Sequence, residues 1–360
     1  MKSYLCRCSN LLILLSGLFV HQIATAQNFS GQTVTMVVNY AAGGPTDIEA
    51  RLAAKFLPKY LAGVRAVVVR NVGGGGGVIA INQMGEASER DSFNIGFFTW
   101  NPLAQLIQDK SLKVKYSDLN FIAGFRQLSL VYARKDTAPG IVTSADIVKA
   151  KFIKAGALGH SNVATIRQRL ALDLLGAKYE TIAGYKGLSE IVLAVRRGDL
   201  DLSADSLPGW VGTVKPSLVD TGIAIPLFQY DFEKNDGTLG RNPELPDIPS
   251  FSEVFAEVKQ GAALPKNDRS QALLLLTRIV DVMYRTVFMP TNAPPSAVAE
   301  MRIAFERLVA DPEFISDYQR VVRTRPNFVS SVQGSSVIAD LNKTPAGLIN
   351  FLREYVDSNR

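Results

Sequence analysis

Two glycine-rich turns constrain the fold of this chain more than any other feature. Gly43-Gly44-Pro45 follows one apolar strand pattern, a run of five glycines at residues 73–77 follows the next, and both open into helical patterns. Glycine lets a ligand approach the backbone without a Cβ in the way. A helix N-terminus adds unpaired N–H groups and the positive end of the helix dipole. The two turns therefore predict a cradle for an anion at the carboxyl edge of a parallel sheet.

Apolar runs and helical patterns alternate along the chain, as they do in β-α-β units. The helix that ends at Leu175 has a polar N-cap at Ser161 or Asn162 and a glycine stop at Gly176. These patterns predict an α/β chain in two units. The expected strands are residues 33–39, 66–70, 93–99, 152–155 and 200–204, and the expected helices are residues 48–60, 141–149, 162–175, 188–197, 297–309, 312–322 and 346–356, with a further helix beginning at residue 78.

Two long apolar stretches are expected to connect these units. Residues 121–133 are too extended for one short strand, so we expect them to cross to the second unit with a hinge near Gln127. Residues 283–289 are expected to return. Residues 231–270 are rich in turn-forming residues, which predicts a long surface excursion.

The N-terminus has the pattern of an export signal. Lys2 and Arg7 flank an apolar run at residues 11–20 on its N-terminal side, and Ala24 and Ala26 form the small-residue motif of a cleavage site. We expect cleavage after Ala26, so that residues 1–26 are a signal peptide. The apolar run is too short to span a bilayer, which needs about 20 residues.

The composition of the mature chain argues against thiol chemistry, a lipid anchor and nucleic-acid binding. Both cysteines, Cys6 and Cys8, lie in the signal, so the mature chain has no thiol, and neither cysteine stands at the cleavage point to receive a lipid anchor. Loss of the two basic signal residues lowers the formal net charge from +6 to +4, and the remaining basic residues are scattered. Nucleic-acid binding, which needs a concentrated basic surface, is not supported.

Cofactor and catalytic motifs are incomplete. Val78 occupies the last glycine position of a dinucleotide fingerprint, and no Walker lysine follows either turn. A Ser-His-Asp triad would have to use His160, the one histidine of the mature chain. Asp205 follows an apolar strand, where it either accepts a hydrogen bond from a ligand or forms an Asx turn. The sequence indicates no catalytic residue, no cofactor and no metal site.

Several motifs, in order along nearly the whole mature chain, resemble the periplasmic solute receptors of tripartite tricarboxylate transporters, also called the Bug or TctC family. They are Tyr40-Ala41-Ala42-Gly43-Gly44-Pro45-Thr46-Asp47 with Ala50-Arg51, Asn71 with the glycine run, Gly184-Tyr185-Lys186-Gly187, Arg197-Gly198-Asp199-Leu200-Asp201 with Asp205-Ser206-Leu207, Leu245-Pro246-Asp247-Ile248-Pro249-Ser250, Pro294-Pro295, and Asp311-Pro312-Glu313-Phe314. The second-lobe turn at residues 156–161 departs from the serine- and glycine-rich run usual in this family.

The resemblance implies a type II periplasmic-binding-protein fold, with two α/β lobes, a hinge and a ligand cleft between them. It implies that residues 27–126 and 287–360 form the first lobe and that residues 127–286 form the second. It also implies a monomeric periplasmic receptor, without an enzymatic activity of its own, that captures a small organic carboxylate and delivers it to membrane permease subunits. Another class remains open, an α/β enzyme acting on a small carboxylate or phosphate, and turnover of the bound compound would distinguish it.

Carried over position by position, the family's ligand contacts come from both glycine turns, the end of the third strand and the second lobe. They fall on Ala42, Gly43, Gly44, Pro45, Thr46, Asp47, Gly74, Gly75, Gly76, Gly77, Thr99, Asn101, Ser161, Asn162 and Asp205.

Overall fold

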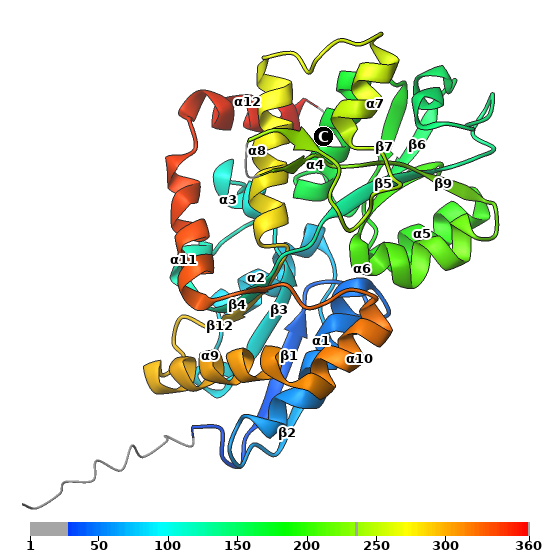
Figure 1. The fold of residues 1–360 in the computed structure, drawn as a ribbon. Helices are drawn as coiled ribbons and strands as arrows, with labels where there is room; N and C mark the ends of the chain where they lie inside the picture. Colours follow the sequence, from blue (N-terminus) through cyan, green and yellow to red (C-terminus); the bar gives the residue numbers. More distant parts are fainter. Residues whose placement is uncertain (1–27, 235–236, 359–360) are drawn as a thin grey trace, which may run out of the picture.

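The structure is a computed structural model that describes residues 28–234 and 237–358 (Figure 1). The expected signal peptide, residues 1–26, lies outside the described residues. Among the residues that are described, no helix combines the length and the apolar character that a membrane span requires.

The first sheet has six strands in the order β13-β4-β12-β3-β1-β2. β1 pairs in parallel with β2 and β3, whereas β12 lies antiparallel between β3 and β4. The last long strand of the chain is therefore inserted into the sheet that the N-terminal segment begins. The strands are β1 (Thr33–Val38), β2 (Ala66–Asn71), β3 (Ile95–Thr99), β4 (Asn120–Phe125), β12 (Arg285–Met289) and β13 (Phe328–Val329).

The second sheet has five strands in the order β7-β6-β8-β5-β9. β6 pairs in parallel with β7 and β8, and β5 lies antiparallel between β8 and β9. The strands are β5 (Ser129–Arg134), β6 (Ile153–Gly156), β7 (Tyr179–Ile182), β8 (Leu202–Ser206) and β9 (Ala224–Gln229), and a separate hairpin joins β10 (Phe232–Glu233) to β11 (Leu239–Gly240).

Helices pack around both sheets, and Figure 1 shows the two sheets one above the other. The predicted two-lobe α/β fold is confirmed. The helices are α1 (Pro45–Phe56), α2 (Val78–Gly85), α3 (Pro102–Leu106), α4 (Val163–Leu175), α5 (Leu188–Arg197), α6 (Leu207–Gly209), α7 (Phe251–Val258), α8 (Asp268–Val282), α9 (Pro295–Ala310), α10 (Pro312–Val322), α11 (Ser331–Asp340) and α12 (Ala346–Asp357).

The local sequence explains where several of these helices start and stop. α1 begins with Pro45 at its first position, where the missing N–H costs nothing. α4 begins at the Asn162 N-cap and ends at Gly176, and α5 ends at Gly198; both glycines have a positive φ, of 82° and 84°. Glycine adopts this left-handed conformation without strain, so these stops follow directly from the sequence.

The chain crosses between the sheets within residues 121–133, as expected. This stretch forms two strands, β4 and β5, with a short connection between them. Residues 126–128 join β4 of the first sheet to β5 of the second, and residues 283–284 join α8 to β12 on the way back. A further connection is formed by the C-terminus: α11 packs on β4 and α12 packs on α8. Figure 1 shows these last two helices running along one side of the molecule from one sheet to the other.

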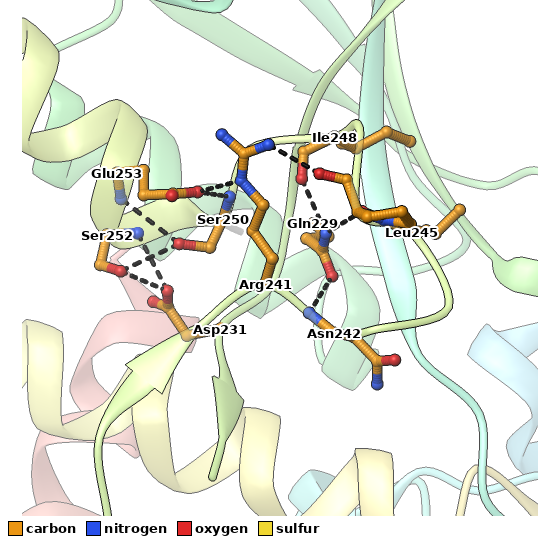
Figure 2. A network of polar contacts seen from close by, with 10 residues as sticks. Gln229, Asp231, Arg241, Asn242, Leu245, Ile248, Ser250, Ser252 and Glu253 are labelled. Carbon is orange, nitrogen blue, oxygen red and sulfur yellow. Dashed lines mark hydrogen bonds and ion pairs between the residues drawn. The ribbon is translucent and has the colours of Figure 1, made fainter.

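Residues 231–270 contain more regular structure than the expected excursion. They include the β10–β11 hairpin, all of α7 and the first turn of α8. Figure 2 shows the polar network that fastens the segment: the Gln229 side-chain amide donates to the carbonyl oxygens of Leu245 and Ile248, both at 2.7 Å, and its oxygen accepts from the Asn242 N–H at 2.8 Å. Gln229 is fully buried, so these bonds replace the water that its amide would otherwise bind.

Two further elements differ from the expected pattern. The helix expected at residues 141–149 is a short 3₁₀ helix at Ser144–Lys149, closed by a capping box between Thr143 and Asp146. Residues 210–219, for which no helix was expected, form a π-helical segment that includes Pro216.

Candidate functional site

A cavity lies between the two lobes, at the carboxyl ends of strands from both sheets. Its first-lobe wall comes from the ends of β1 and β3 and the start of α1, and its second-lobe wall comes from α4, α5, β8 and the residues after β6 and β9. Open α/β sheets bind ligands at this edge. The lining residues are Tyr40, Gly44, Pro45, Thr46, Thr99, Trp100, Ser129, Leu158, Asn162, Val163, Ala164, Arg167, Leu188, Ala204, Asp205, Tyr230, Val280 and Tyr284.

The lobes are closed over this cavity. Its empty space totals about 610 Å³ with the open mouth included, but the centre of a water molecule fits in only about 30 Å³ of it. Hydrogen bonds cross directly between the lobes: the Asn162 side chain donates to the Tyr40 hydroxyl at 2.9 Å, and the Val163 N–H donates to Asn101 Oδ1 at 3.0 Å. A metabolite therefore needs the lobes to separate before it can enter.

The first glycine turn brings its helix N-terminus to the cavity. Gly44 is the N-cap of α1 in an extended conformation, with φ −84° and ψ 169°, and it lines the cavity together with Pro45 and Thr46. The Thr46 and Thr99 hydroxyls lie 2.7 Å apart, which joins α1 to the end of β3. The first-turn N–H groups of a helix have no intrahelical partner, so this end can bind an anion.

The neighbouring residues of this turn support the backbone from behind. Asp47 Oδ2 accepts from the Gly43 N–H and from Arg51 Nε, both at 2.9 Å. Burial opposes ionisation of this carboxyl, but the bonds from Arg51 and Gly43 outweigh it and lower the pKa of Asp47. Ala42 contributes a carbonyl that the Ser189 hydroxyl approaches at 3.5 Å across the cleft. Ala42, Gly43 and Asp47 are not among the lining residues.

The second glycine turn meets the other lobe instead of lining the cavity. The Gly76 carbonyl accepts from the Tyr40 hydroxyl at 2.9 Å and from Asn162 Nδ2 at 3.1 Å. A Cβ on Gly77 would lie 2.6 Å from Asn39 Nδ2 and 3.0 Å from the Tyr40 hydroxyl oxygen. Gly77 therefore packs within its own lobe, whereas a Cβ added to Gly159 of the second lobe would lie 3.2 Å from Gly76 Cα, so glycine allows close backbone contact between the lobes there. None of Gly74, Gly75, Gly76 and Gly77 borders the cavity.

The start of α4 forms the opposite wall. The Asn162 side-chain oxygen accepts from the Ala164 N–H at 3.0 Å, and both residues line the cavity with Val163. Ser161 and Asn101 stand beside the cavity: Asn101 Nδ2 donates to the Ser161 carbonyl at 3.4 Å. Of the fifteen expected contact residues, Gly44, Pro45, Thr46, Thr99, Asn162 and Asp205 line the cavity.

Asp205 on β8 is the acidic residue of the cavity wall. It is 2 % exposed, and burial raises its pKa to about 7, against the lowering effects of the Ser206 N–H and of Arg285. Its Oδ1 accepts from the Ser206 N–H at 2.7 Å. Near neutral pH this carboxyl is therefore available in both its protonated and its ionised form.

The sequence patterns did not indicate Arg167 and Tyr230, which also line the cavity. Arg167 lies one helical turn after Val163, so both face the same side of α4. Its guanidinium lies 3.9 Å from the ring centroid of Tyr230. The spacing from the Asn162 N-cap is the one signal in the sequence that could have indicated Arg167; Tyr230 has no comparable signal.

The described residues contain no cluster of side chains suited to binding a metal ion. Within residues 28–234 and 237–358, no three histidine, cysteine, aspartate or glutamate side chains are grouped to hold a metal ion. His160, the residue that a Ser-His-Asp triad would need, is not among the lining residues of the cavity.

The fold resembles that of two-lobe periplasmic binding proteins. The structure resembles that of the periplasmic binding protein BugD, with a TM-score of 0.66, 19% identity and coverage of 91% of this chain and 97% of that one. It also resembles MatC from Rhodopseudomonas palustris, with a TM-score of 0.63, 19% identity and coverage of 90% and 98%.

Comparison by sequence also finds a similar protein. A UPF0065 protein from the TAR-I ttuE-ttuC' intergenic region of Agrobacterium vitis is 28% identical over 251 residues, which cover 67% of either chain. No protein-family model matches the chain. The predicted resemblance to the Bug and TctC solute receptors is confirmed.

Proposed function

We propose that this protein is a periplasmic solute-binding receptor that captures a small organic carboxylate between its lobes and delivers it to the permease of a tripartite tricarboxylate transporter. One observation supports the proposal above all: the N-terminus of α1 and the first turn of α4 border the same interlobe cavity. Helix N-termini favour negative charge; on α4 the Val163 and Ala164 N–H groups already donate to Asn101 and Asn162, so the backbone donors for an anion are expected from α1.

The similar proteins support the same ligand class. MatC is described with bound malate, a small carboxylate. A hydrogen bond to a charged group contributes roughly 1.5 to 3 kcal/mol, and a partly buried helix dipole adds up to about 2 kcal/mol. A few such contacts reach the roughly 8 kcal/mol of a micromolar site, even after the cost of closing the lobes.

The proposal includes how the chain is divided and where it works. Residues 27–126 and 287–360 form the first lobe and residues 127–286 the second, with α12 reaching across to α8. After removal of residues 1–26 the protein is a monomer in the periplasm, not anchored by lipid, and the lobes bend about the connections near Gln127. The receptor has no chemistry of its own and releases its ligand unaltered, which separates it from an α/β enzyme.

A ligand panel tests the proposal. The purified mature protein is heated with acetate, butyrate, succinate, malate, citrate or adipate, and we expect one of these acids to raise its melting temperature. At a concentration of 100 Kd, binding adds about 2.7 kcal/mol to the free energy of unfolding. The acid recovered afterwards is analysed by mass spectrometry. A chemically changed acid would support the enzyme instead, and no shift with any member would count against the receptor.

Gly44→Val tests the position of the anion cradle. Gly44 has an extended backbone, and a Cβ there has no atom closer than 3.6 Å, so the variant is expected to fold normally. Its branched side chain occupies the approach to the α1 N-terminus, and we expect the melting-temperature shift with the best acid of the panel to disappear.

Gly347→Val is the matched control for this substitution. Gly347 also lies near the start of a helix and is exposed, and a Cβ added to it would have no atom within 4 Å. Its binding should equal that of the unmodified protein. Full binding by Gly44→Val would place the anion elsewhere.

A further inference from the structure

We infer that Arg167 and Tyr230, with Trp100, form a subsite that binds a carboxylate group of the ligand and selects for that charge. This inference rests on the proposed receptor function and adds to it a set of side chains in the same cavity. It gives the second-lobe wall a recognition role that backbone N–H groups at α1 do not provide.

The three residues present hydrogen-bond donors without acceptors. Trp100 Nε1, Arg167 Nε and the Tyr230 hydroxyl are buried and have no hydrogen-bond partner among the described residues, and all three residues line the cavity. A buried donor without an acceptor destabilises the folded protein. A molecule rich in acceptor oxygens, placed in this cavity, would supply the missing partners.

The positive charge of Arg167 favours a negatively charged molecule at this position. Its side chain is 1% exposed, with Nη2 donating to Asp281 at 3.3 Å and Nη1 donating to Ser129 Oγ at 3.1 Å. These bonds hold the guanidinium in place and leave its Nε–H unused. A carboxylate is the acceptor that a guanidinium binds most strongly, since the bond is charge-assisted.

Tyr230 orients this guanidinium and adds a donor. The guanidinium carbon lies over the Tyr230 ring, 3.9 Å from its centroid, and this cation–π contact helps to hold the guanidinium in position. Burial raises the pKa of Tyr230 above its usual value, so the hydroxyl keeps its proton and can donate. A donor pair held in position before binding lowers the entropy cost of capturing the carboxylate.

The other residues that line the cavity explain why the charge of the ligand has to be paired with Arg167 and Tyr230. Much of the wall around Arg167 is apolar, with Leu158, Val163, Leu188 and Val280 bordering the same cavity. An unpaired carboxylate against such side chains would lose its hydration without compensation. The subsite therefore favours an acid over a neutral analogue of the same size.

Helix α4 contains a second arginine that serves as a control. Arg169 is 2% exposed and lies over the Tyr355 ring at 4.6 Å, as Arg167 does over Tyr230, but neither Arg169 nor Tyr355 lines the cavity. Arg169 also keeps one buried N–H group without a partner, Nη1, whereas the Tyr355 hydroxyl donates to Asp173 at 2.6 Å. If burial and the contact with the ring alone explained a loss of ligand binding, substitutions in both arginine–tyrosine pairs would weaken binding.

Calorimetric titration tests the subsite. The best acid among acetate, butyrate, succinate, malate, citrate and adipate is titrated into the unmodified protein and into Arg167→Gln, Tyr230→Phe, Arg169→Gln and Tyr355→Phe. We expect Arg167→Gln to weaken binding about 10- to 100-fold and Tyr230→Phe about 3- to 10-fold, because each removes a donor to a charged group. Both control variants should stay within about twofold.

Tyr230→Phe also separates binding from a structural role. It removes one oxygen that has no partner, so the melting temperature of the ligand-free variant should be equal to or higher than that of the unmodified protein, while its affinity falls. This variant keeps the test decisive if Arg167→Gln fails to fold.

The outcomes distinguish this inference from the proposed function. Binding of no acid by the unmodified protein would overturn the receptor and the subsite together. Binding by the unmodified protein, with Tyr230→Phe within about twofold of it, would overturn the subsite and leave the receptor standing. An equal loss in the Arg167 and Arg169 variants would overturn it as well.

Discussion

Asp205 is a carboxyl group in surroundings that oppose its ionisation. Burial raises the pKa of Asp205 and outweighs the lowering effect of Arg285 on β12; Asp205 in turn raises the pKa of Tyr132 on β5 and of Tyr284. A carboxyl of this kind can donate a hydrogen bond when protonated and accept one when ionised. Its protonation state therefore alters which ligand groups the cavity wall can accept.

The raised pKa of Asp205 predicts how stability depends on pH. The folded state holds the proton up to about pH 7, whereas the unfolded chain releases it near 3.8, so the folded state binds more protons between these values. Stability attributable to this group is present at low pH and declines as the pH rises to about 7, by at most about 1.4 kcal/mol per pH unit.

Asp205→Asn removes this titration. In urea unfolding from about pH 4.5 to about pH 8.5, we expect the variant to gain stability relative to the unmodified protein as the pH rises to about 7, and the difference to level off above it. Asp199→Asn, at an exposed carboxylate, is the control. A difference between Asp205→Asn and the unmodified protein that does not change with pH would contradict the assignment.

Helix α4 combines two tasks in its N-cap. The Asn162 oxygen caps the helix through the Ala164 N–H, and the Asn162 amide nitrogen donates across the cleft to the Tyr40 hydroxyl and the Gly76 carbonyl. One side chain therefore links the end of an element to the closed arrangement of the lobes. A loss of the cap alone costs about 1 kcal/mol, and the cross-lobe bonds add to it.

Asn162→Asp separates the two tasks. The carboxylate can still cap α4, but it cannot donate to Tyr40 or Gly76, and it repels the Gly76 carbonyl. Because the cap is kept and only the cross-lobe bonds are lost, we expect a smaller loss of unfolding stability than removal of the whole side chain would cause, a larger radius of gyration by small-angle X-ray scattering, and affinity for the best acid lowered about tenfold. Asn267→Asp, at the N-cap of α8, should change none of these. An unchanged radius would argue against a role of Asn162 in closure.

Elements with local signals could be predicted from the sequence, and elements defined by distant partners could not. The glycine turns, the Asn162 cap and the Gly176 and Gly198 stops are short-range features, and the structure has all of them. α8 was missed although Asn267 and Ser270 form a capping box, because the turn-forming residues before it dominated the pattern. The antiparallel insertion of β12 between β3 and β4 depends on residues far apart in the chain.

The same distinction applies to the site. Gly44, Pro45 and Thr46 border the cavity because they belong to a turn with a recognisable pattern. Arg167 and Tyr230 come together from α4 and the end of β9, and nothing in their local sequence indicates that they are in contact. The side chains proposed to set specificity are therefore the part of the site that sequence reasoning could not reach.

At the scale of the whole molecule, a buried ion pair lies where the lobes meet. Arg285 Nε on β12 and Glu49 Oε2 on α1 are 2.7 Å apart, each side chain 1% exposed, and Glu49 also accepts from the Tyr318 hydroxyl at 2.6 Å and from Gln127. Arg285 donates further to Thr99 on the first sheet and to Ser206 on the second. The pair thus connects both sheets beside the connection at Gln127.

Glu49→Gln leaves the Arg285 cation buried without its anion. We expect a loss of about 3–5 kcal/mol in the free energy of unfolding, measured by urea denaturation, because the desolvated charge is no longer compensated. Asp317→Asn removes the partner of the exposed Lys55 and Arg320 side chains; it is the comparison and should change stability far less. Equal losses in the two variants would show that burial of the Glu49 pair adds nothing.

The position of Trp100 gives the protein an optical property. The chain contains two tryptophans, and they are differently placed: Trp100 lines the interlobe cavity, whereas Trp210 lies in the π-helical segment with its ring 6.3 Å from that of Tyr132. Indole emission shifts with the polarity around the ring, and separation of the lobes would admit solvent to Trp100. The fluorescence of the unlabelled protein is therefore expected to change when the cavity opens, through the indole that lines it.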